Sequence, residues 1–414
     1  MFSPEFQVPS PYGDGWQNAT HIKILFFAII LLAELLWGSF VGVRFGRGLL
    51  YVWYHHYALR RNCVENNSLR LKKLEKFLLL SERKSQHPVK VVVVAGESAT
   101  RSAMGCYSGS ENTTPFFSSM LGNSGFYLFP RAYAREIFTC KVLPNMFTRL
   151  SPRWHRNFFE TPSLFDVCSR AGVRIKYISN QYSYIGDWNN YLAGVAKEYP
   201  GRSIYDAGIA DLRTLPDGCL LDAVVSEFEN VPGNMASLTV VHMFGSHFPF
   251  EKRVPEKFAE EHYGSNTARE CYLNTILYSD IFLKNVFERF VDSVSGPGCI
   301  IYVSDHGEDV TGRVKRSEEL SSVCKEMLEI PLAVWVSKEF ASLYPEKVEA
   351  LRCNVSKLFI NDYLYDSVLD LFDFADCGNV VWDARQSVFS SSYREPERTV
   401  ECIGGQSRLG DWFR

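Results

Sequence analysis

The chain has 414 residues, of which 46% are hydrophobic and 22% are charged, and its formal net charge is −3. This globular composition is sufficient for one large domain with an appendage. The chain lacks the basic excess of nucleic-acid-binding proteins, so that class is excluded.

The first predicted element is a membrane-spanning helix over residues 22–44, which follows an N-terminal segment, residues 1–21. The run from Ile24 to Val43 is apolar except for Glu34, and a helix of that length spans about 30 Å, the thickness of a bilayer core. A buried helix of a soluble core is the alternative, whereas a cleaved signal peptide is disfavoured because no A-x-A pattern follows. Glu34 at mid-membrane predicts a neighbouring membrane partner. The arginines after the helix favour a cytoplasmic position for the rest of the chain.

A linker over residues 45–88 contains the second element, a predicted amphipathic helix. Its sequence LRLKKLEKFLLL gathers leucines near one helical face and lysines elsewhere. Two interpretations are open, since the helix could pack on its own domain or lie on an anionic membrane surface. His87 and Pro88 end the pattern, and a catalytic domain is predicted over residues 89–414.

The catalytic domain alternates short apolar runs with helical segments. The predicted strands are residues 89–95, 173–179, 238–242, 299–304 and 330–336, and the clearest helices are 220–228 and 273–294. Continuous hydrophobicity indicates strands that are covered on both faces, so we expect an α/β sandwich with a mostly parallel sheet. Eleven cysteines without a CxxC pair argue against a zinc ribbon and leave either several disulfides or buried thiols.

Metal-binding and acid–base residues follow three of these strands. Glu97 follows the first, His242 ends the third and is followed by His247, and Asp305 and His306 follow the fourth. In open α/β sheets, sites form beyond the carboxyl ends of the strands, so these side chains are expected to converge. Glu97, Asp305 and His306 form an O,O,N ligand set suited to zinc or a related divalent ion.

Thr139 comes just before an apolar helical run in the segment REIFTCKVLPNMFTRL. A hydroxyl at a helix N-terminus gains from the helix dipole as it loses its proton, and a nearby metal ion lowers its pKa further. A helix N-cap is the alternative role for Thr139.

Five stretches carry a family resemblance, namely GESATRSAMGCY, ENTTPFF, FTCKVLPNMFT, VVHMFGSHFPF and YVSDHGEDV. In order and strand context they resemble the signature stretches of bacterial inner-membrane phosphoethanolamine transferases, which belong to the alkaline phosphatase and sulfatase superfamily. The likeness is closest to members that act on the lipopolysaccharide core. It implies a sulfatase-like sandwich preceded by one transmembrane helix, with zinc held by Glu97, Thr139, Asp305 and His306. Thr139 would be the nucleophile, and His247, with His242 close by, would sit at the phosphoryl or second-metal site.

The resemblance also implies a reaction. Phosphoethanolamine would pass from phosphatidylethanolamine to Thr139 and then to lipopolysaccharide core, lipid A or another lipid-linked glycan, in a catalytic domain that faces the periplasm. A phosphoglycerol transferase or metal-dependent phosphodiesterase of the same superfamily is the first alternative, and a catalytically degenerate membrane scaffold is the second. A sulfatase is discarded because Cys140 does not begin a C-x-P-S-R motif.

One departure from the family concerns the segment after His306, which contains no further histidine. Where relatives of this type tend to carry histidine, this chain has Glu326, and Glu318 and Glu319 are other candidates in the same loop. Either Glu326 is a solvated loop residue, or its carboxylate joins His247 in a weak second site that tolerates Mn²⁺ or Mg²⁺.

Overall fold

A computed structural model describes most of the predicted catalytic domain and a few residues before it. The described residues are 75, 82–85, 87–108, 111–148, 162–181, 215–310, 323–375, 381–396, 399–402 and 405–408. They lie in the second of two compact units, Glu65–Arg414. The predicted segments 1–21 and 22–44, with Glu34, and most of the linker 45–88 fall outside them. Within the described ranges, no helix combines the length and apolarity needed to cross a membrane.

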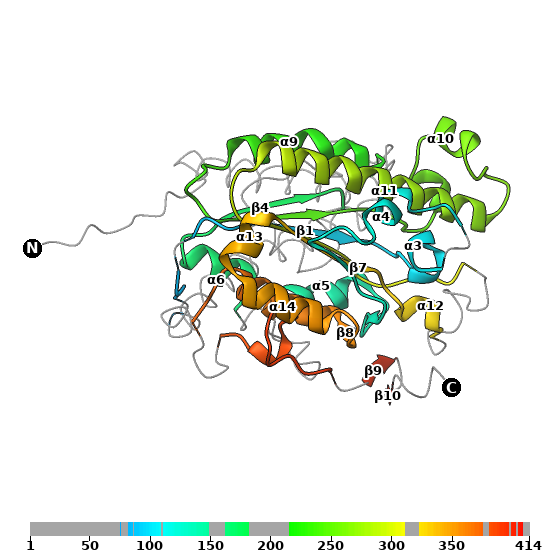
Figure 1. Ribbon diagram of the computed structural model, residues 1–414. Coiled ribbons are helices and arrows are strands. Elements are labelled where there is room, and N and C mark those ends of the chain that lie inside the picture. The colour runs from blue at the N-terminus through cyan, green and yellow to red at the C-terminus, as the bar shows by residue number, and fades with distance from the viewer. Residues whose placement is uncertain are drawn as a thin grey trace, which may run out of the picture. The chain divides into compact units, whose positions relative to one another are not determined.

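A six-stranded sheet forms the centre of the domain (Figure 1). Its strands, in spatial order, are β2 (Phe126–Leu128), β7 (Leu332–Val336), β6 (Gly298–Ser304), β1 (Lys90–Gly96), β5 (Ser237–His242) and β4 (Arg174–Ser179). The four strands β6, β1, β5 and β4 are parallel, and β7 is antiparallel to both β6 and β2. The carboxyl ends of β1, β5 and β6 therefore meet at one edge of the sheet.

Helices cover both faces of this sheet, as Figure 1 shows. One face carries α4 (Pro115–Met120), α9 (Leu221–Asn230) and the long α11 (Ala268–Ser293). The other face carries α5 (Thr139–Phe147), α6 (Leu164–Arg170), α13 (Lys338–Leu343), α14 (Pro345–Asn354) and α15 (Leu364–Leu371). Shorter elements are α3 (Gly105–Ser108), α10 (Glu256–Glu261), α12 (Lys325–Leu328), the pair β3 (Ala132–Tyr133) and β8 (Phe359–Ile360), and the hairpin β9 (Thr399–Cys402) and β10 (Gly405–Arg408).

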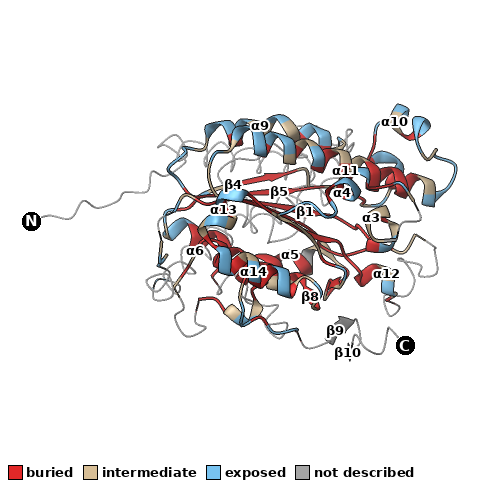
Figure 2. Cartoon of the chain, viewed as in Figure 1, coloured by how far each residue is buried: buried red, intermediate tan, exposed pale blue. Residues whose placement is uncertain are grey.

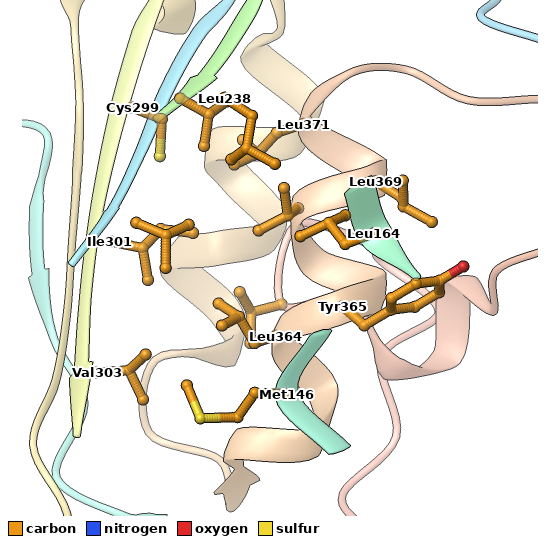
Figure 3. Packing of buried hydrophobic residues seen from close by; sticks show 14 of the residues in the cluster. Met146, Leu164, Leu238, Cys299, Ile301, Val303, Leu364, Tyr365, Leu369 and Leu371 are labelled. Carbon is orange, nitrogen blue, oxygen red and sulfur yellow. The ribbon is translucent and has the colours of Figure 1, made fainter. Parts of the chain in front are cut away.

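Strand β1 is buried throughout, and Figure 2 shows the central strands mostly in red, whereas the edge strand β2 is half-buried. Alternate residues enter different cores: Val91 and Val93 pack on the α5 side, and Val92 and Val94 on the α11 side. Full burial of one such side chain is worth about 1.5–3 kcal/mol. Figure 3 shows the α5-side core, where Ile301 and its neighbours on the sheet pack against residues from α5, α6 and α15. These two cores fix the strand ends from both faces.

The predicted α/β sandwich with a mostly parallel sheet is confirmed. All five predicted strands and both predicted helices occur, with boundaries shifted by a few residues. The short edge strand β2 was not predicted, because three half-buried residues carry too little periodicity. Among the cysteines whose side chains the structure describes, seven are free thiols: Cys106, Cys168, Cys219, Cys271, Cys299, Cys324 and Cys353. For these seven, the disulfide alternative is wrong.

Candidate functional site

The ends of β1 and β6 bring Glu97 and Asp305 together. The two strands pair in parallel with Gly96 opposite Ser304, so the next residue of each chain segment leaves the sheet side by side. The backbone N–H of Asp305 donates to the Gly96 carbonyl at 3.1 Å, and the Ser98 N–H donates to Asp305 Oδ1 at 3.0 Å. Both carboxylates are fully buried. Their separation is therefore set by the ladder of the sheet.

Helix α5 begins at Thr139 and directs its first side chain between these carboxylates. Oγ1 of Thr139 lies 2.9 Å from Glu97 Oε2, 2.7 Å from Asp305 Oδ2 and 3.5 Å from His306 Nε2. Phe138 is the N-cap residue, and no side-chain capping bond is made there. The N-cap role for Thr139 is therefore wrong, because its hydroxyl is turned toward the carboxylates.

His306 presents a lone pair to the same point. Its Nδ1 lies 2.8 Å from the Gly307 carbonyl, which can only accept, so Nδ1 carries the proton. In the neutral ring Nε2 has a lone pair, and this atom lies 3.5 Å from Glu97 Oε1 and 3.4 Å from Asp305 Oδ2. A protonated Nδ1 held by a carbonyl is the arrangement typical of histidines that bind metal through Nε2.

The described residues contain one group suited to a metal ion, formed by Glu97, Asp305 and His306. Their ligand atoms all lie within 4.8 Å of one another, and all three residues are buried. The single proton of the Thr139 hydroxyl can serve only one of the two carboxylates at a time. Two buried carboxylates beside an imidazole nitrogen fit a divalent cation, and the O,O,N donor set suits zinc.

The charges in the group shift both carboxyl pKa values. Burial raises the pKa of Asp305 well above its usual range, and the negative charge of Glu97 adds to that rise. Burial also raises the pKa of Glu97, but His306 and His247, with two side-chain hydrogen bonds, outweigh it and lower the pKa to about 2. Two carboxylates at this distance stay ionised together only beside positive charge.

His242 is the last residue of β5, and among the described residues it is not part of the metal group. Its Nδ1 is 2.9 Å from the Tyr177 hydroxyl and 3.1 Å from Ser179 Oγ. Burial lowers the pKa of His242 to about 4, against the opposing charge of Glu97, so its imidazole is neutral at pH 7. Its Nε2 has no hydrogen-bond partner in the described structure. The predicted role of His242 at a substrate or second-metal site stays a prediction.

His247 is half-buried in the loop of residues 243–249, which we call the His247 loop. Its ring lies edge-on to that of Phe244, with centroids 5.1 Å apart, and it interacts electrostatically with Glu97. The loop folds onto Glu97, because the Ser246 N–H donates to the Glu97 carbonyl at 2.9 Å. Gly245 has φ +47°, and a Cβ there would lie 2.8 Å from that carbonyl oxygen, so the approach requires glycine.

Glu326 lies on the short helix α12, which packs beside the end of β6. The Gly307 N–H donates to the Met327 carbonyl at 2.8 Å and holds this helix next to His306. The Glu326 side chain is half-buried and interacts with the thiol of Cys324. Among the described residues, the metal group does not include Glu326, and its proposed partnership with His247 stays a prediction.

The sequence interpretation missed Gln181, which follows β4. Its Nε2 donates to Glu97 Oε2 at 2.8 Å and to the Met243 carbonyl at 2.9 Å. The sequence predicts the strand before Gln181, residues 173–179. Because polar residues that follow such strands build the site, the same argument applied to this strand points to Gln181. Ser98 was also missed, and its hydroxyl donates to Glu97 Oε1 at 2.7 Å.

Comparisons with known proteins agree on a family and a fold. The sulfatase family model matches residues 90–374. Phosphoethanolamine transferase OpgE of Escherichia coli is 28% identical over 270 residues, which cover 61% of this chain and 48% of that protein. Phosphoethanolamine transferase EptC of the same organism is 23% identical and is matched over 84% of this chain and 61% of its own length. The chain thus spans about half to three-fifths of these curated relatives.

Two solved structures share the fold at low sequence identity. The periplasmic domain of E. coli EptC, crystallised with and without zinc, has a TM-score of 0.68 at 20% identity and covers 79% of this chain and 94% of that domain. The integral membrane protein EptA from Neisseria meningitidis has a TM-score of 0.61 at 20% identity, covering 88% of this chain and 73% of its own. The expected alkaline phosphatase and sulfatase-like fold is thereby confirmed.

Proposed function

The chain belongs to the sulfatase family, and on that premise we propose that it transfers phosphoethanolamine from phosphatidylethanolamine to a lipid-linked glycan. The observation that carries this proposal is the Thr139 hydroxyl, held at the start of α5 between Glu97 and Asp305. The similarity to proteins named phosphoethanolamine transferases supports the transferred group. The acceptor is lipopolysaccharide core, lipid A or another lipid-linked glycan.

The reaction proceeds in two displacements at Thr139. Oγ1 attacks the phosphorus of phosphatidylethanolamine, an O–P bond forms, and the bond to the diacylglycerol oxygen breaks. The proton of the hydroxyl passes to that oxygen, so diacylglycerol leaves as an alcohol. An acceptor oxygen then attacks the same phosphorus, and Thr139 regains a proton as its bond to phosphorus breaks. His247 is half-exposed beside Glu97 and is suited to carry these protons, because imidazole titrates near neutral pH.

Glu97, Asp305, His306 and Thr139 would hold a catalytic zinc ion. Two observations support this assignment: the O,O,N ligand set is buried, and the Thr139 hydroxyl lies beside it. When bound, the ion supplies positive charge that lowers the pKa of the hydroxyl and stabilises negative charge on phosphate oxygens. Gln181 and Ser98 orient the Glu97 carboxylate, and the start of α5 favours negative charge at Oγ1. His242, His247 and Glu326 are proposed to line the substrate or a weak second site for Mn²⁺ or Mg²⁺.

Both substrates are lipids, which motivates a membrane location. We propose that residues 22–44 anchor the chain in the bacterial inner membrane, that residues 45–88 lie along its surface, and that residues 89–414 face the periplasm. A membrane partner near Glu34 belongs to this proposal. The similarity to the integral membrane protein EptA supports it.

Intact mass spectrometry tests the proposal directly. Zinc-loaded protein is incubated with phosphatidylethanolamine in detergent, and we expect a phosphoethanolamine adduct that peptide mapping locates at Thr139, together with released diacylglycerol. The Thr139→Ala protein and phosphatidylglycerol as donor are the controls. A glycerol-phosphate adduct formed from phosphatidylglycerol would instead support the phosphoglycerol transferase alternative. Absence of adduct and of diacylglycerol release with every donor would support the scaffold reading.

A further inference from the structure

Two buried, oppositely charged residues that the proposed chemistry does not use hold the His247 loop. The first is Asp217, whose exposed fraction is 4%. Its Oδ1 accepts from the Phe244 N–H at 2.8 Å, and its Oδ2 accepts from the Gly245 N–H at 2.8 Å. One carboxylate thus fixes two successive peptide N–H groups, three and two residues before His247. Hydrogen bonds between a charged group and peptide N–H groups are stronger than neutral ones and have defined geometry.

The second residue is Arg253, whose exposed fraction is 7%. Its guanidinium carbon lies 4.1 Å from the centroid of the Phe244 ring, and its Nε donates to the Pro249 carbonyl at 3.3 Å. Arg253 therefore contacts the loop on both sides of His247. Its positive charge also acts on Asp217. The opposite charges of the two side chains that hold the loop therefore offset each other.

Asp217 also connects the loop to the segment that follows β4. The Asn180 Nδ2 donates to Asp217 Oδ1 at 2.8 Å, and the next residue, Gln181, reaches the Glu97 carboxylate. Burial raises the pKa of Asp217, and the hydrogen bonds to its carboxylate oppose that rise. Burying two charged side chains costs desolvation free energy, and such pairs can specify one local conformation, here that of the His247 loop.

The position of His247 follows from these contacts. The Phe244 ring, held by Arg253 at its face and by Asp217 through its backbone, lies edge-on to the imidazole. Among the described residues, the metal group includes neither Asp217 nor Arg253. We propose that Asp217 and Arg253 are positioning residues that hold His247 beside Glu97 in the orientation that the proposed proton transfer requires. This inference rests on the proposed function.

A double-mutant cycle separates positioning from general structural support. Asp217→Asn keeps the size of the side chain but loses one of the two acceptors, and Asp222→Asn, at an exposed position of α9, is the matched control. We expect Asp217→Asn to lower the rate of phosphoethanolamine transfer roughly 10–100-fold, as removal of supporting contacts around active-site groups typically does. KM and zinc content should change little, and Asp222→Asn should match the wild type.

The same change is then made in a His247→Ala background. If Asp217 acts through His247, Asp217→Asn adds little to the loss that His247→Ala already causes. An equal loss in both backgrounds, or no loss in either, overturns the proposal. Arg253→Lys keeps the charge but removes the planar stacking on Phe244, and it repeats the test should Asp217→Asn fail to fold. Lys252→Ala, at the exposed neighbouring position, is its control.

A spectroscopic measurement keeps this inference separate from the proposed function. The imidazole ¹⁵N signals of His247 in zinc-loaded protein should shift in Asp217→Asn and in Arg253→Lys, whereas those of His262 on the surface should not. This readout needs no substrate, so it remains decisive if the wild type transfers nothing. Unchanged His247 signals in both variants would show that the two ions do not position it.

Discussion

The hydroxyl of Thr139 lies 2.7 Å from Oδ2 of Asp305, although 166 residues separate them in the sequence. The contact joins the first residue of α5 to the residue that follows β6, and it exists because α5 packs on the face of the sheet toward which Asp305 projects. The Thr139 hydroxyl, two buried carboxylates and an imidazole nitrogen thus lie close together.

Thr139→Ala is expected to abolish transfer and the covalent adduct while leaving the fold intact. The hydroxyl bonds to the carboxylates of Glu97 and Asp305 and not to the helix backbone, so the free energy of unfolding should fall by about 1–3 kcal/mol. Thr139→Ser should retain part of the activity, because it keeps the attacking oxygen. Transfer rates and thermal unfolding measure both effects, and wild-type turnover by Thr139→Ala would rule out the covalent route.

Glu97→Gln is expected to cut zinc affinity sharply, since it keeps the shape of the side chain and removes its charge. Zinc measured by elemental analysis after dialysis should fall well below the wild-type content. Glu256→Gln, an exposed glutamate on α10, should retain zinc. Equal zinc in the Glu97→Gln protein and the wild type would mean that Glu97 is not a ligand.

Glu326→Ala tests the proposed second site. We expect one tightly held ion per chain, and activity that rises when divalent ion in the millimolar range is added, because carboxylate ligands favour Mn²⁺ and Mg²⁺. Glu326→Ala should lose that rise and keep the tight zinc, while Glu339→Ala, an exposed glutamate on α13, should behave as the wild type. An undiminished rise in Glu326→Ala would remove this carboxylate from the chemistry.

Asp280 is expected to make stability depend on pH. It accepts from the Phe116 N–H at 2.8 Å and the Phe117 N–H at 3.2 Å at the start of α4, and burial raises its pKa to about 6. A carboxyl whose pKa is higher in the folded state binds more protons there, so its contribution is full below about pH 4 and is lost as the pH rises through 6. The unfolding free energy of wild type minus that of Asp280→Asn should fall by about 1–3 kcal/mol between pH 4 and 7. Chemical denaturation across this range measures the difference, and a flat or rising difference would contradict the assignment.

The sequence by itself predicted the parallel sheet and most of the metal group. Runs such as VVVV before Glu97 are too apolar for any place but the interior, and chain direction dictates that Glu97 and Asp305 leave neighbouring parallel strands at the same edge. The sequence also indicated Thr139, because its hydroxyl lies at the start of a predicted helix. It left open whether this hydroxyl caps the helix or takes part in the reaction.

Only the tertiary structure decided which way that hydroxyl turns and which residues support the group. Gln181 and Asp217 look like ordinary loop residues in the sequence, and their roles follow from contacts with Glu97 and Phe244. Hydrophobic periodicity records which side chains must leave water, so it predicts strands, helices and the edge at which they end. It carries no information about which loops meet above that edge, because those contacts depend on hydrogen-bond geometry between segments far apart in the chain.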